Sequence, residues 1–216
     1  MRPLLLGHRG ARASRHIPEN TLASFELCLQ HGCDGFEFDV RRSADGVAVI
    51  CHDPSFAGRE IENTPAKDLA LPTLEQVLQR FSTRAFLDIE LKVLGLETQL
   101  IAPLRKHPPG KGYVVSSFLP EALNAVRELE AGIPLGVLFE QEDQFPPPGL
   151  PVAWTIPKAE LASREVIERA HAAGKKVMVW TANHADQMRQ FVEWGVDAII
   201  SDETELLVRT LRQGRE

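Results

Sequence analysis

Short apolar segments alternate with amphipathic helical segments along most of this chain. Residues 4–7 form the first apolar segment, and Asn20 opens a helical pattern that stops at Gly32. Alternation of this kind predicts parallel strands joined by right-handed crossovers. Eight such strands remain once the antiparallel arm of one predicted hairpin is set aside. In a chain of 216 residues, eight parallel strands favour an α/β fold with a closed (β/α)8 barrel, the TIM barrel.

The second half of the pattern is the more regular one. Thr73 caps a predicted helix that runs to Phe81, with Gln76 at the capping-box position. The strands expected after it are residues 85–91, 113–117, 135–139, 152–156, 177–181 and 198–201. The helices expected among them are residues 96–104, 120–129, 163–173, 184–194 and 203–212. No helix is expected between Phe139 and Val152, because the proline run at 146–148 forbids one.

A β-hairpin and a short cap follow the second predicted strand, residues 36–40. Asp45-Gly46 is a strong signal for a two-residue turn, and the return strand covers residues 47–51. Pairing outward from this turn places Asp39 opposite His52, with Cβ atoms about 5 Å apart. Residues 54–71 show no clear period and are expected to form a loop or a small cap. The hairpin is therefore expected to bring a histidine to an acidic residue.

Length and composition favour a single domain over residues 1–216. The chain is 44% hydrophobic, which suffices for a sizeable core, and its net charge of −6 argues against a general nucleic-acid binder. The three cysteines have irregular spacing, so they predict neither a disulfide framework nor a zinc motif. No signal-peptide pattern and no apolar run of about 18 residues is present. We therefore expect a cytoplasmic protein without stable membrane insertion.

Acidic residues gather where predicted strands end. Glu37 and Asp39 are two positions apart on one strand, so both side chains point to the same face. Glu90 stands at the end of another strand. Carboxylates buried together in a barrel need a cation, and three oxygen ligands suit Mg²⁺ or Ca²⁺ better than zinc. The structural alternative is a salt-bridged set with Arg9, Arg41 and Lys92.

Two histidines lie at strand ends beside these acids, His8 after the first strand and His52 after the hairpin. A histidine pair suits general acid–base work, because one protonates the leaving oxygen while the other activates the nucleophile. Arg9 and Lys92 are suited to hold phosphate oxygens, the arginine through its planar fork and the lysine as a point charge. These residues together indicate metal-assisted attack on a phosphate ester.

Several short motifs occur in a fixed order from His8 to Asp202. They are His8-Arg9-Gly10, Pro18-Glu19-Asn20-Thr21, Glu37-x-Asp39, Asp45-Gly46 with His52-Asp53, Pro72-Thr73-Leu74-Glu75, Asp88-Ile89-Glu90-Leu91-Lys92, Ser116-Ser117-Phe118, Val179-Trp180-Thr181-Ala182-Asn183 and Gly195-Val196-Asp197-Ala198-Ile199-Ile200-Ser201-Asp202. Each motif alone is weak, but their joint order and spacing are highly specific. In these motifs the chain resembles the glycerophosphodiester phosphodiesterase family.

The resemblance implies a TIM barrel that cleaves glycerophosphodiesters to glycerol 3-phosphate and an alcohol. Its implied ligands for a divalent metal are Glu37, Asp39 and Glu90. Its implied acid–base pair is His8 and His52. Its implied phosphate-binding residues are Arg9 and Lys92. The partner expected from the resemblance is a small glycerophosphodiester, and no nucleic acid.

The resemblance also implies supporting residues around the site. Trp180 would form an aromatic wall of the pocket, Glu19 would support the metal site or its water, and Asn20 would cap the first helix. The chain departs from the family pattern after His52-Asp53-Pro54, where many members carry a longer segment. Here residues 55–60 run quickly to Pro72, so the short cap concerns selectivity for the alcohol rather than the phosphodiester chemistry.

Other functions fit the same sequence. Lysophospholipase D-like or phospholipase C-like cleavage would use the same barrel, although no basic amphipathic stretch marks a membrane-binding surface. A catalytically inactive barrel used for binding is the alternative from another class, and the presence of every matched acid, histidine and cation argues against it. Direct attack by water and attack by the neighbouring glycerol hydroxyl are both compatible with these residues, and no pattern indicates an oligomeric state.

Overall fold

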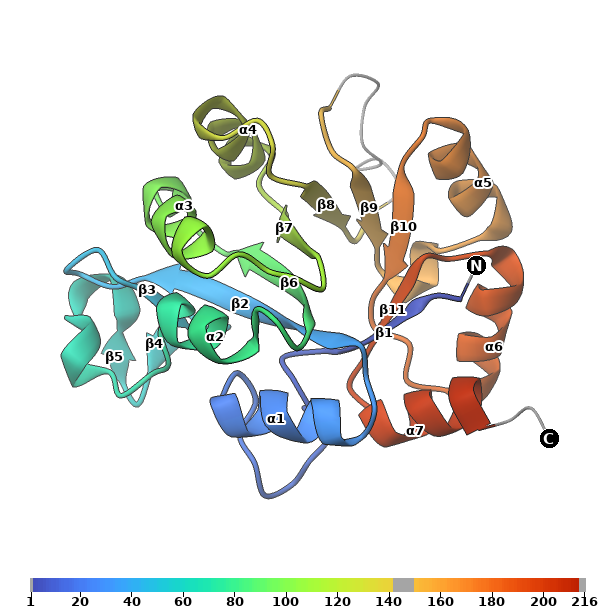
Figure 1. Cartoon of the computed structure of the whole chain (residues 1–216), viewed down its shortest axis with the longest axis horizontal. Helices are drawn as coiled ribbons and strands as arrows, with labels where there is room; N and C mark the ends of the chain where they lie inside the picture. The colour runs from blue at the N-terminus through green and yellow to red at the C-terminus, as the bar shows by residue number, and fades with distance from the viewer. Residues whose placement is uncertain (1, 142–149, 214–216) are drawn as a thin grey trace.

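The computed structural model describes residues 2–141 and 150–213, and within these ranges eight parallel strands form a closed ring (Figure 1). Around the ring the strands are β1 (Leu4–Gly7), β11 (Ala198–Ser201), β10 (Lys176–Val179), β9 (Trp154–Pro157), β8 (Leu135–Phe139), β7 (Tyr113–Ser117), β6 (Phe86–Leu91) and β2 (Gly35–Arg42). β1 also pairs with β2, which closes the ring. The predicted (β/α)8 barrel is therefore confirmed.

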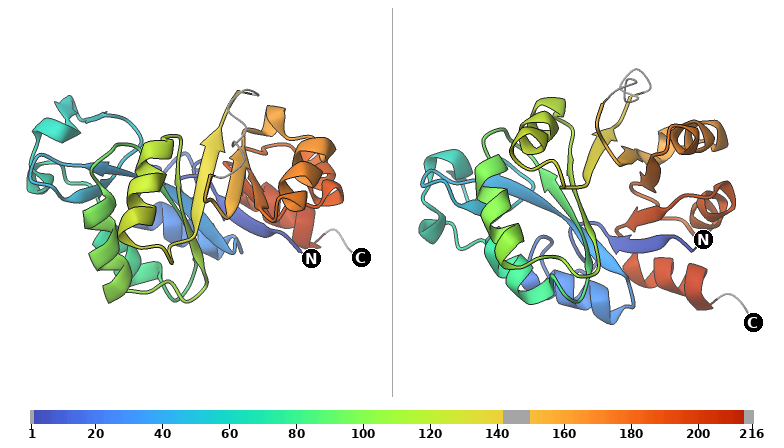
Figure 2. Two further views of the ribbon diagram at one scale, coloured as in Figure 1. Left: turned by 90° about the horizontal axis from the view of Figure 1, so that it is seen from above. Right: turned by 45° about the horizontal axis from the view of Figure 1, so that its top comes forward.

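Helices cover the outside of this ring, as Figure 1 and the two views of Figure 2 show. They are α1 (Leu22–Gln30), α2 (Leu74–Phe81), α3 (Glu97–Lys106), α4 (Pro120–Leu129), α5 (Arg164–Ala172), α6 (Ala185–Trp194) and α7 (Thr204–Val208). Thr73 caps α2 with the predicted capping box, in which Gln76 bonds back to the backbone of Thr73. The last predicted helix, residues 203–212, consists of two parts: α7 is followed directly by a π-helix over Arg209–Gln213.

Alternation along the strands separates the inside of the barrel from the outside. On β2, Phe36 and Phe38 point outward, and Phe36 stacks on Phe25 of α1 with ring centroids 4.3 Å apart. Glu37 and Asp39 lie between them in sequence and therefore point inward. The inner core of the barrel is apolar and contains Leu6, Phe86, Val114, Leu138, Trp154, Ile156, Met178, Ala198 and Ile200. The carboxylates are thus buried beside an apolar interior.

The register of the predicted hairpin is wrong by one residue. β2 pairs with β3 (Ala48–Ile50) so that Val40 lies opposite Ile50, and the Cys51 amide donates to Asp39. Asp39 therefore faces Cys51 rather than His52. The reason is the turn: the amide of Gly46 donates to Ser43 and Gly46 has φ +79°, which makes a three-residue loop with a bulge at the glycine.

Residues 54–71 form the small cap that the sequence predicts. It contains a two-stranded hairpin of β4 (Ser55–Phe56) and β5 (Arg59–Glu60), followed by 3₁₀ turns at Ile61–Asn63 and Ala66–Asp68. Ile61 and Leu69 pack on Val49 and Cys51 in a separate buried cluster. The cap projects from the barrel beside β3 (Figure 1), and this cluster packs it against that strand.

Two further expectations meet the structure only in part. β9 begins two residues later than the predicted strand at 152–156. The expectation that no helix lies between Phe139 and Val152 falls largely on residues 142–149, outside the described residues.

The three cysteines are free and buried. Within the described ranges, no helix is both long and apolar enough to span a membrane.

Candidate active site at the ends of the barrel strands

A cavity of about 290 Å³ lies where the barrel strands end. Its lining residues come from four strands, β2, β6, β8 and β11, and from the segments that follow β1, β3, β6, β7, β8 and β10. They are His8, Arg9, Glu37, His52, Glu90, Lys92, Phe118, Leu138, Glu140, Trp180 and Ile200. A larger depression of about 630 Å³ between α3 and α4 is lined by no acid and no histidine. Of these two cavities, only the smaller one is lined by acids and histidines.

The expected metal ligands form one cluster beneath this cavity. β2 and β6 pair in parallel so that Asp39 lies opposite Glu90, and Glu37 is two residues earlier on β2. One carboxylate oxygen from each of the three lies within 4.8 Å of the others. All three residues are buried, with exposed fractions of 3% for Glu37, 1% for Asp39 and 6% for Glu90. Strand pairing thus brings together ligands that are far apart in sequence.

Unsatisfied oxygen atoms show that the cluster fits a cation. Among the described residues, Glu37 Oε1 has no hydrogen-bond partner. Asp39 Oδ1 also lacks a hydrogen bond, although Lys92 Nζ lies 3.3 Å away in ion-pair contact. Buried carboxylate oxygens without donors are costly, and a hard divalent cation satisfies them. The cluster is compatible with a divalent metal.

Burial and mutual repulsion divide the three carboxyl groups. Burial, followed by the nearby Asp39, raises the pKa of Glu90 to about 7. Burial and the same neighbour raise the pKa of Glu37 well above its usual range. Burial acts to raise the pKa of Asp39 as well, but Lys92, Arg9 and the Asn20 amide outweigh it and leave that pKa lowered. Asp39 is therefore the carboxylate whose ionised form its neighbours favour.

The two expected phosphate-binding residues lie beside these carboxylates. Lys92 Nζ is 2.6 Å from Glu90 Oε1 and 3.3 Å from Asp39 Oδ1. Arg9 Nε is 3.3 Å from Asp39 Oδ2, and the Arg9 backbone amide donates to Glu37 Oε2 at 2.9 Å. Both side chains also line the cavity. The salt-bridged set weighed as the structural alternative is thus present for Arg9 and Lys92, whereas Arg41 donates to the carbonyl of His52.

His8 is oriented by a carboxylate from the opposite end of the chain. Its Nδ1 lies 2.7 Å from Asp202 Oδ1, and its Nε2 lies 3.9 Å from Glu37 Oε2. An ionised carboxylate only accepts, so the Nδ1 atom carries the proton in this bond. Asn183 Nδ2 donates to the other oxygen of Asp202 at 2.7 Å. The free Nε2 of His8 is therefore turned toward the metal-ligand cluster.

His52 has a similar but more open arrangement. Its Nδ1 lies 2.8 Å from Asp53 Oδ1, and this aspartate is 74% exposed. The ring lines the cavity on the side where the hairpin ends. The structure therefore brings His52 to the same cavity as His8, although the hairpin register differs from the predicted one.

Of the two supporting residues Glu19 and Trp180, only Glu19 has contacts that differ from the expected ones. Glu19 accepts from Arg9 and Arg12, each at 2.7 Å, and lies outside the carboxylate cluster. Trp180 lines the cavity as expected, packs edge-on against Phe118 with centroids 5.5 Å apart, and donates its indole N–H to the backbone. Glu19 thus acts on Arg9 rather than directly on the expected ligands.

The cap predicted for Asn20 is wrong. Thr21 caps α1 instead, because its side chain accepts from the Ser24 amide. Asn20 is buried with φ +56°, and its Nδ2 donates to Asp39 Oδ2 at 2.8 Å. Asparagine and threonine are both favoured at the N-cap of a helix. Here the Asn20 side chain bonds to the buried Asp39 carboxylate, which needs a donor, and Thr21 serves as the cap.

Local sequence patterns assign no role to several residues of the site. Asp202 and Asn183 belong to the motifs at the ends of the last two strands, but the contact between Asp202 and His8 spans 194 positions. One signal was available: the first and last strands of a closed barrel are neighbours, and Gly7 pairs with Ser201, so the residues that follow them meet. Asp88 is fully buried on the inner face of β6 and accepts from Ser116 at 2.6 Å.

Comparison with known proteins agrees with the class that the fold and the site define. A closed parallel barrel carries a metal-compatible carboxylate cluster, two histidines and two cationic side chains around one small cavity, a set that is suited to hydrolysis of a phosphate diester. The chain is a TIM-barrel phosphoric diester hydrolase. The sequence model of the Glycerophosphoryl diester phosphodiesterase family matches residues 8–77 and 56–206. The chain belongs to this family.

Individual relatives extend the similarity over nearly the whole chain. The glycerophosphodiester phosphodiesterase of Caldanaerobacter subterraneus subsp. tengcongensis is 28% identical, over 99% of this chain and 100% of the relative. That of Bacillus subtilis is 27% identical, over 95% of this chain and 85% of the relative.

Solved structures agree as well. A phosphodiesterase from Oleispira antarctica, in complex with the product sn-glycerol-3-phosphate, has a TM-score of 0.84 and 26% identity, covering 97% of this chain and 96% of that one. A glycerophosphodiester phosphodiesterase from Parabacteroides distasonis has a TM-score of 0.88 at 22% identity, covering 100% and 99%, and shows the same fold.

Proposed function

We propose that this chain is a metal-dependent phosphodiesterase that hydrolyses glycerophosphodiesters to glycerol 3-phosphate and an alcohol. The observation that carries the proposal is the buried carboxylate cluster, which adjoins a cavity lined by two histidines, an arginine and a lysine. The cavity of about 290 Å³ suits a small ester. Membership of the family, the activity of the named relatives and the product bound to the Oleispira antarctica enzyme support the substrate class.

Glu37, Asp39 and Glu90 would hold a divalent cation in this proposal. Oxygen ligands alone suit Mg²⁺ or Ca²⁺. When bound, the cation supplies charge neutralisation and polarises a phosphoryl oxygen. The contribution of the chain is to keep Asp39 ionised through Lys92, Arg9 and the Asn20 amide, so that the site is ready for a cation.

His8 and His52 would exchange protons with the ester. In each ring the aspartate bond fixes Nδ1 as the donor, which leaves Nε2 as the atom that takes up or gives a proton. One histidine protonates the leaving alcohol oxygen, and the other removes a proton from the nucleophile. The pair serves equally when the nucleophile is water and when it is the neighbouring glycerol hydroxyl, which gives a cyclic phosphate first.

The remaining lining residues would hold the two ends of the substrate. Arg9 and Lys92 present their cationic groups to the phosphate, and the Lys92 Nζ also lies 5.7 Å from the centre of the Phe118 ring. Leu138, Trp180 and Phe118 offer an apolar wall for the carbon atoms of glycerol or of the alcohol. A bound diester would therefore be gripped at the phosphate and shielded from water on one side.

The test is turnover of glycerophosphocholine by the purified protein, with release of glycerol 3-phosphate followed by a coupled dehydrogenase. Turnover is expected with Mg²⁺ or Ca²⁺, to be lost with EDTA and to return with excess metal. Parallel assays with lysophosphatidylcholine distinguish the small diesters from lysolipids. A protein that turns over none of these substrates with any divalent metal would contradict the proposal.

A further inference from the structure

Arg12 connects His8 and Arg9 through the carboxylates that bond to them, Asp202 and Glu19. It lies in the loop between β1 and α1, and its Nη1 donates to Asp202 Oδ1 at 3.1 Å. Its Nε donates to Glu19 Oε2 at 2.7 Å. Asp202 is the partner of His8, and Glu19 is the partner of Arg9 at 2.7 Å. The guanidinium of Arg12 therefore bridges Asp202, which orients His8, and Glu19, which bonds to Arg9.

We propose that Arg12 is a positioning residue that fixes His8 and Arg9 relative to one another. This inference rests on the proposed function, in which His8 moves a proton and Arg9 holds the phosphate. A guanidinium is planar and presents its N–H groups in a rigid fork, so two acceptors bound to it keep a fixed separation. The fork thus sets the distance between the proton-transfer group and the phosphate clamp.

The contacts of the two carboxylates support a role in positioning rather than in folding. The side chain of Arg12 is 39% exposed, and exposed ion pairs contribute little to stability. Asp202 and Glu19 are only 17% and 34% exposed, however, and each has its other contacts in the site. Asp202 also holds the loop itself, because its backbone carbonyl accepts from the Ala13 amide. Loss of the fork would break the link between the two carboxylates, while Asp202 keeps its bonds to His8 and Asn183 and Glu19 keeps its bond to Arg9.

The first measurement compares Arg12→Gln with the wild type on glycerophosphocholine at saturating metal. Displacement of catalytic groups by about 1 Å costs roughly a hundredfold, so kcat/KM is expected to fall by about 10- to 100-fold. Both a lower kcat and a higher KM should contribute, because Asp202 and Glu19 each lose the bond that links them through Arg12. Arg12→Lys should recover only part of the loss, since a point charge does not bridge two carboxylates in a fixed geometry.

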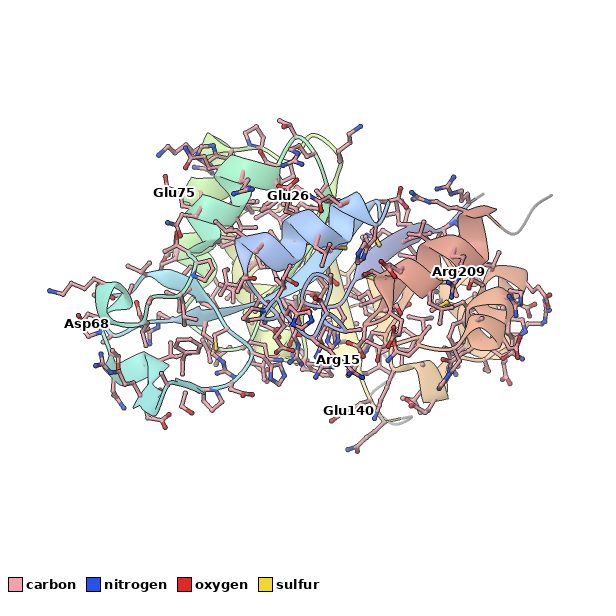
Figure 3. All side chains as sticks on the ribbon, turned by 90° about the horizontal axis from the view of Figure 1, so that it is seen from below. Arg15, Glu26, Asp68, Glu75, Glu140 and Arg209 are labelled. Carbon is pink, nitrogen blue, oxygen red and sulfur yellow. The ribbon has the colours of Figure 1, made fainter. Side chains whose placement is uncertain are left out.

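Arg15→Gln is the matched control. Arg15 is an exposed arginine of the same loop (Figure 3), and in the described part of the chain it makes no ion pair. The substitution removes the same charge from the same segment. Its kinetic constants should stay within about twofold of the wild type, because long-range effects of exposed charges are screened by salt.

Double mutants separate the two links. Asp202→Asn is expected to lower mainly kcat, and Glu19→Gln to raise mainly KM. In the Asp202→Asn background, Arg12→Gln should add little further loss of kcat, and in the Glu19→Gln background it should add little further rise of KM, because residues of one network are not additive. Effects that multiply fully in both backgrounds would show that Arg12 acts through neither carboxylate, and would overturn the proposal.

Two controls keep the outcomes distinct. A wild-type protein without turnover contradicts the proposed function, whatever Arg12 does. With an active wild type, an Arg12→Gln variant that matches Arg15→Gln overturns the positioning role alone. Thermal unfolding of Arg12→Gln should lie within about 2 °C of the wild type, as expected for an exposed ion pair. A markedly less stable or unfolded variant would assign Arg12 to the fold and would also overturn the proposal.

Discussion

Asp202 and Asp53 give the two site histidines different surroundings. The side chains of His8 and Asp202 are 12% and 17% exposed, whereas those of His52 and Asp53 are 36% and 74% exposed. A hydrogen bond away from water is electrostatically stronger and is less often exchanged for water. His8 is therefore held in one tautomer and one orientation more firmly than His52.

This difference predicts unequal effects of removing the two aspartates. Asp202→Asn is expected to lower kcat by roughly 10²–10⁴-fold, because the amide favours the wrong tautomer of the ring and general acid–base catalysis is lost. Asp53→Asn should cost under about tenfold, because an exposed ion pair contributes little to orientation. Steady-state kinetics at saturating metal check this, and equal losses in the two variants would contradict it.

Asn20 provides a second prediction at the scale of single residues. Asn20→Gly keeps the positive φ without strain but removes the donor from buried Asp39. A buried acceptor left without its partner costs about 1–3 kcal/mol, so the free energy of unfolding should fall by that amount. Urea denaturation measures the loss. A loss below about 0.5 kcal/mol would show that water replaces the amide at Asp39.

At the scale of elements, one carboxylate ties α1 to α2. Glu26, on the side of α1 next to α2 (Figure 3), bonds to Arg84 at 2.6 Å and to Arg80 at 3.1 Å. Both guanidinium groups also lie about 5.5 Å from the Phe81 ring. The bond from Arg84, and then that from Arg80, lowers the pKa of Glu26 from 4.5 to about 2.

Glu26→Gln is therefore expected to have a pH-dependent effect on stability. Because the pKa is lower in the folded state, the stabilisation is present above the unfolded value of 4.5 and is lost as pH falls toward 2. The pair is partly exposed, so the loss at pH 7 should stay under about 1 kcal/mol. Urea denaturation of both proteins at pH 7 and near pH 2.5 should show a difference that shrinks in acid. A constant difference would point to packing instead.

The small cap leads to a prediction about selectivity. No residue of 54–71 lines the cavity; Phe56 is 41% exposed, and Arg59 donates to the carbonyl of Asp68. Closure of a cap over the alcohol is a usual source of discrimination. Choline, ethanolamine and glycerol diesters should therefore have kcat/KM values within roughly tenfold, about 1.4 kcal/mol in transition-state binding. A thousandfold preference would place discrimination elsewhere, such as in residues 140–150.

For the whole molecule, the proposed metal site predicts that stability depends on bound metal. A ligand at a hundred times its Kd stabilises the folded state by about 2.7 kcal/mol, which corresponds to about 5–10 °C in Tm for a domain of this size. Mg²⁺ or Ca²⁺ should produce this rise, and EDTA should remove it. Glu37→Gln should abolish most turnover and most of the metal-dependent rise in Tm. Its Tm in EDTA should not fall below that of the wild type, because the substitution removes a buried carboxyl group that is costly without a cation. A full shift in that variant would exclude Glu37 as a ligand.

The barrel and much of its site were predictable because they depend on local patterns. The alternation on β2 determines that Glu37 and Asp39 face inward, whatever the details of packing. Thr73 caps α2 through a short-range signal that the sequence shows directly. The parallel order of the strands then brings Glu90 to the same place. These steps need only the period of the pattern and the handedness of the crossovers.

The remaining features depend on contacts that no local pattern encodes. The hairpin register differs from the predicted one because Gly46 serves as a bulge rather than as the second residue of a tight turn. The role of Asn20 depends on a carboxylate 19 positions away. The bridge of Arg12 to Asp202 spans 190 positions and forms in a loop without a period. Tertiary contacts of this kind follow from the closed fold and are not visible before it.

The pairing of β1 with both β11 and β2 has a consequence for biosynthesis. The ribosome releases the expected metal ligands of β2 and β6 early, whereas the aspartate that orients His8 emerges after the last strand. A nascent chain stalled before β11 holds the three carboxylates but no partner for His8. Phosphodiesterase turnover would therefore begin only when translation has delivered the final strand, and it would serve as a kinetic marker of ring closure on the ribosome.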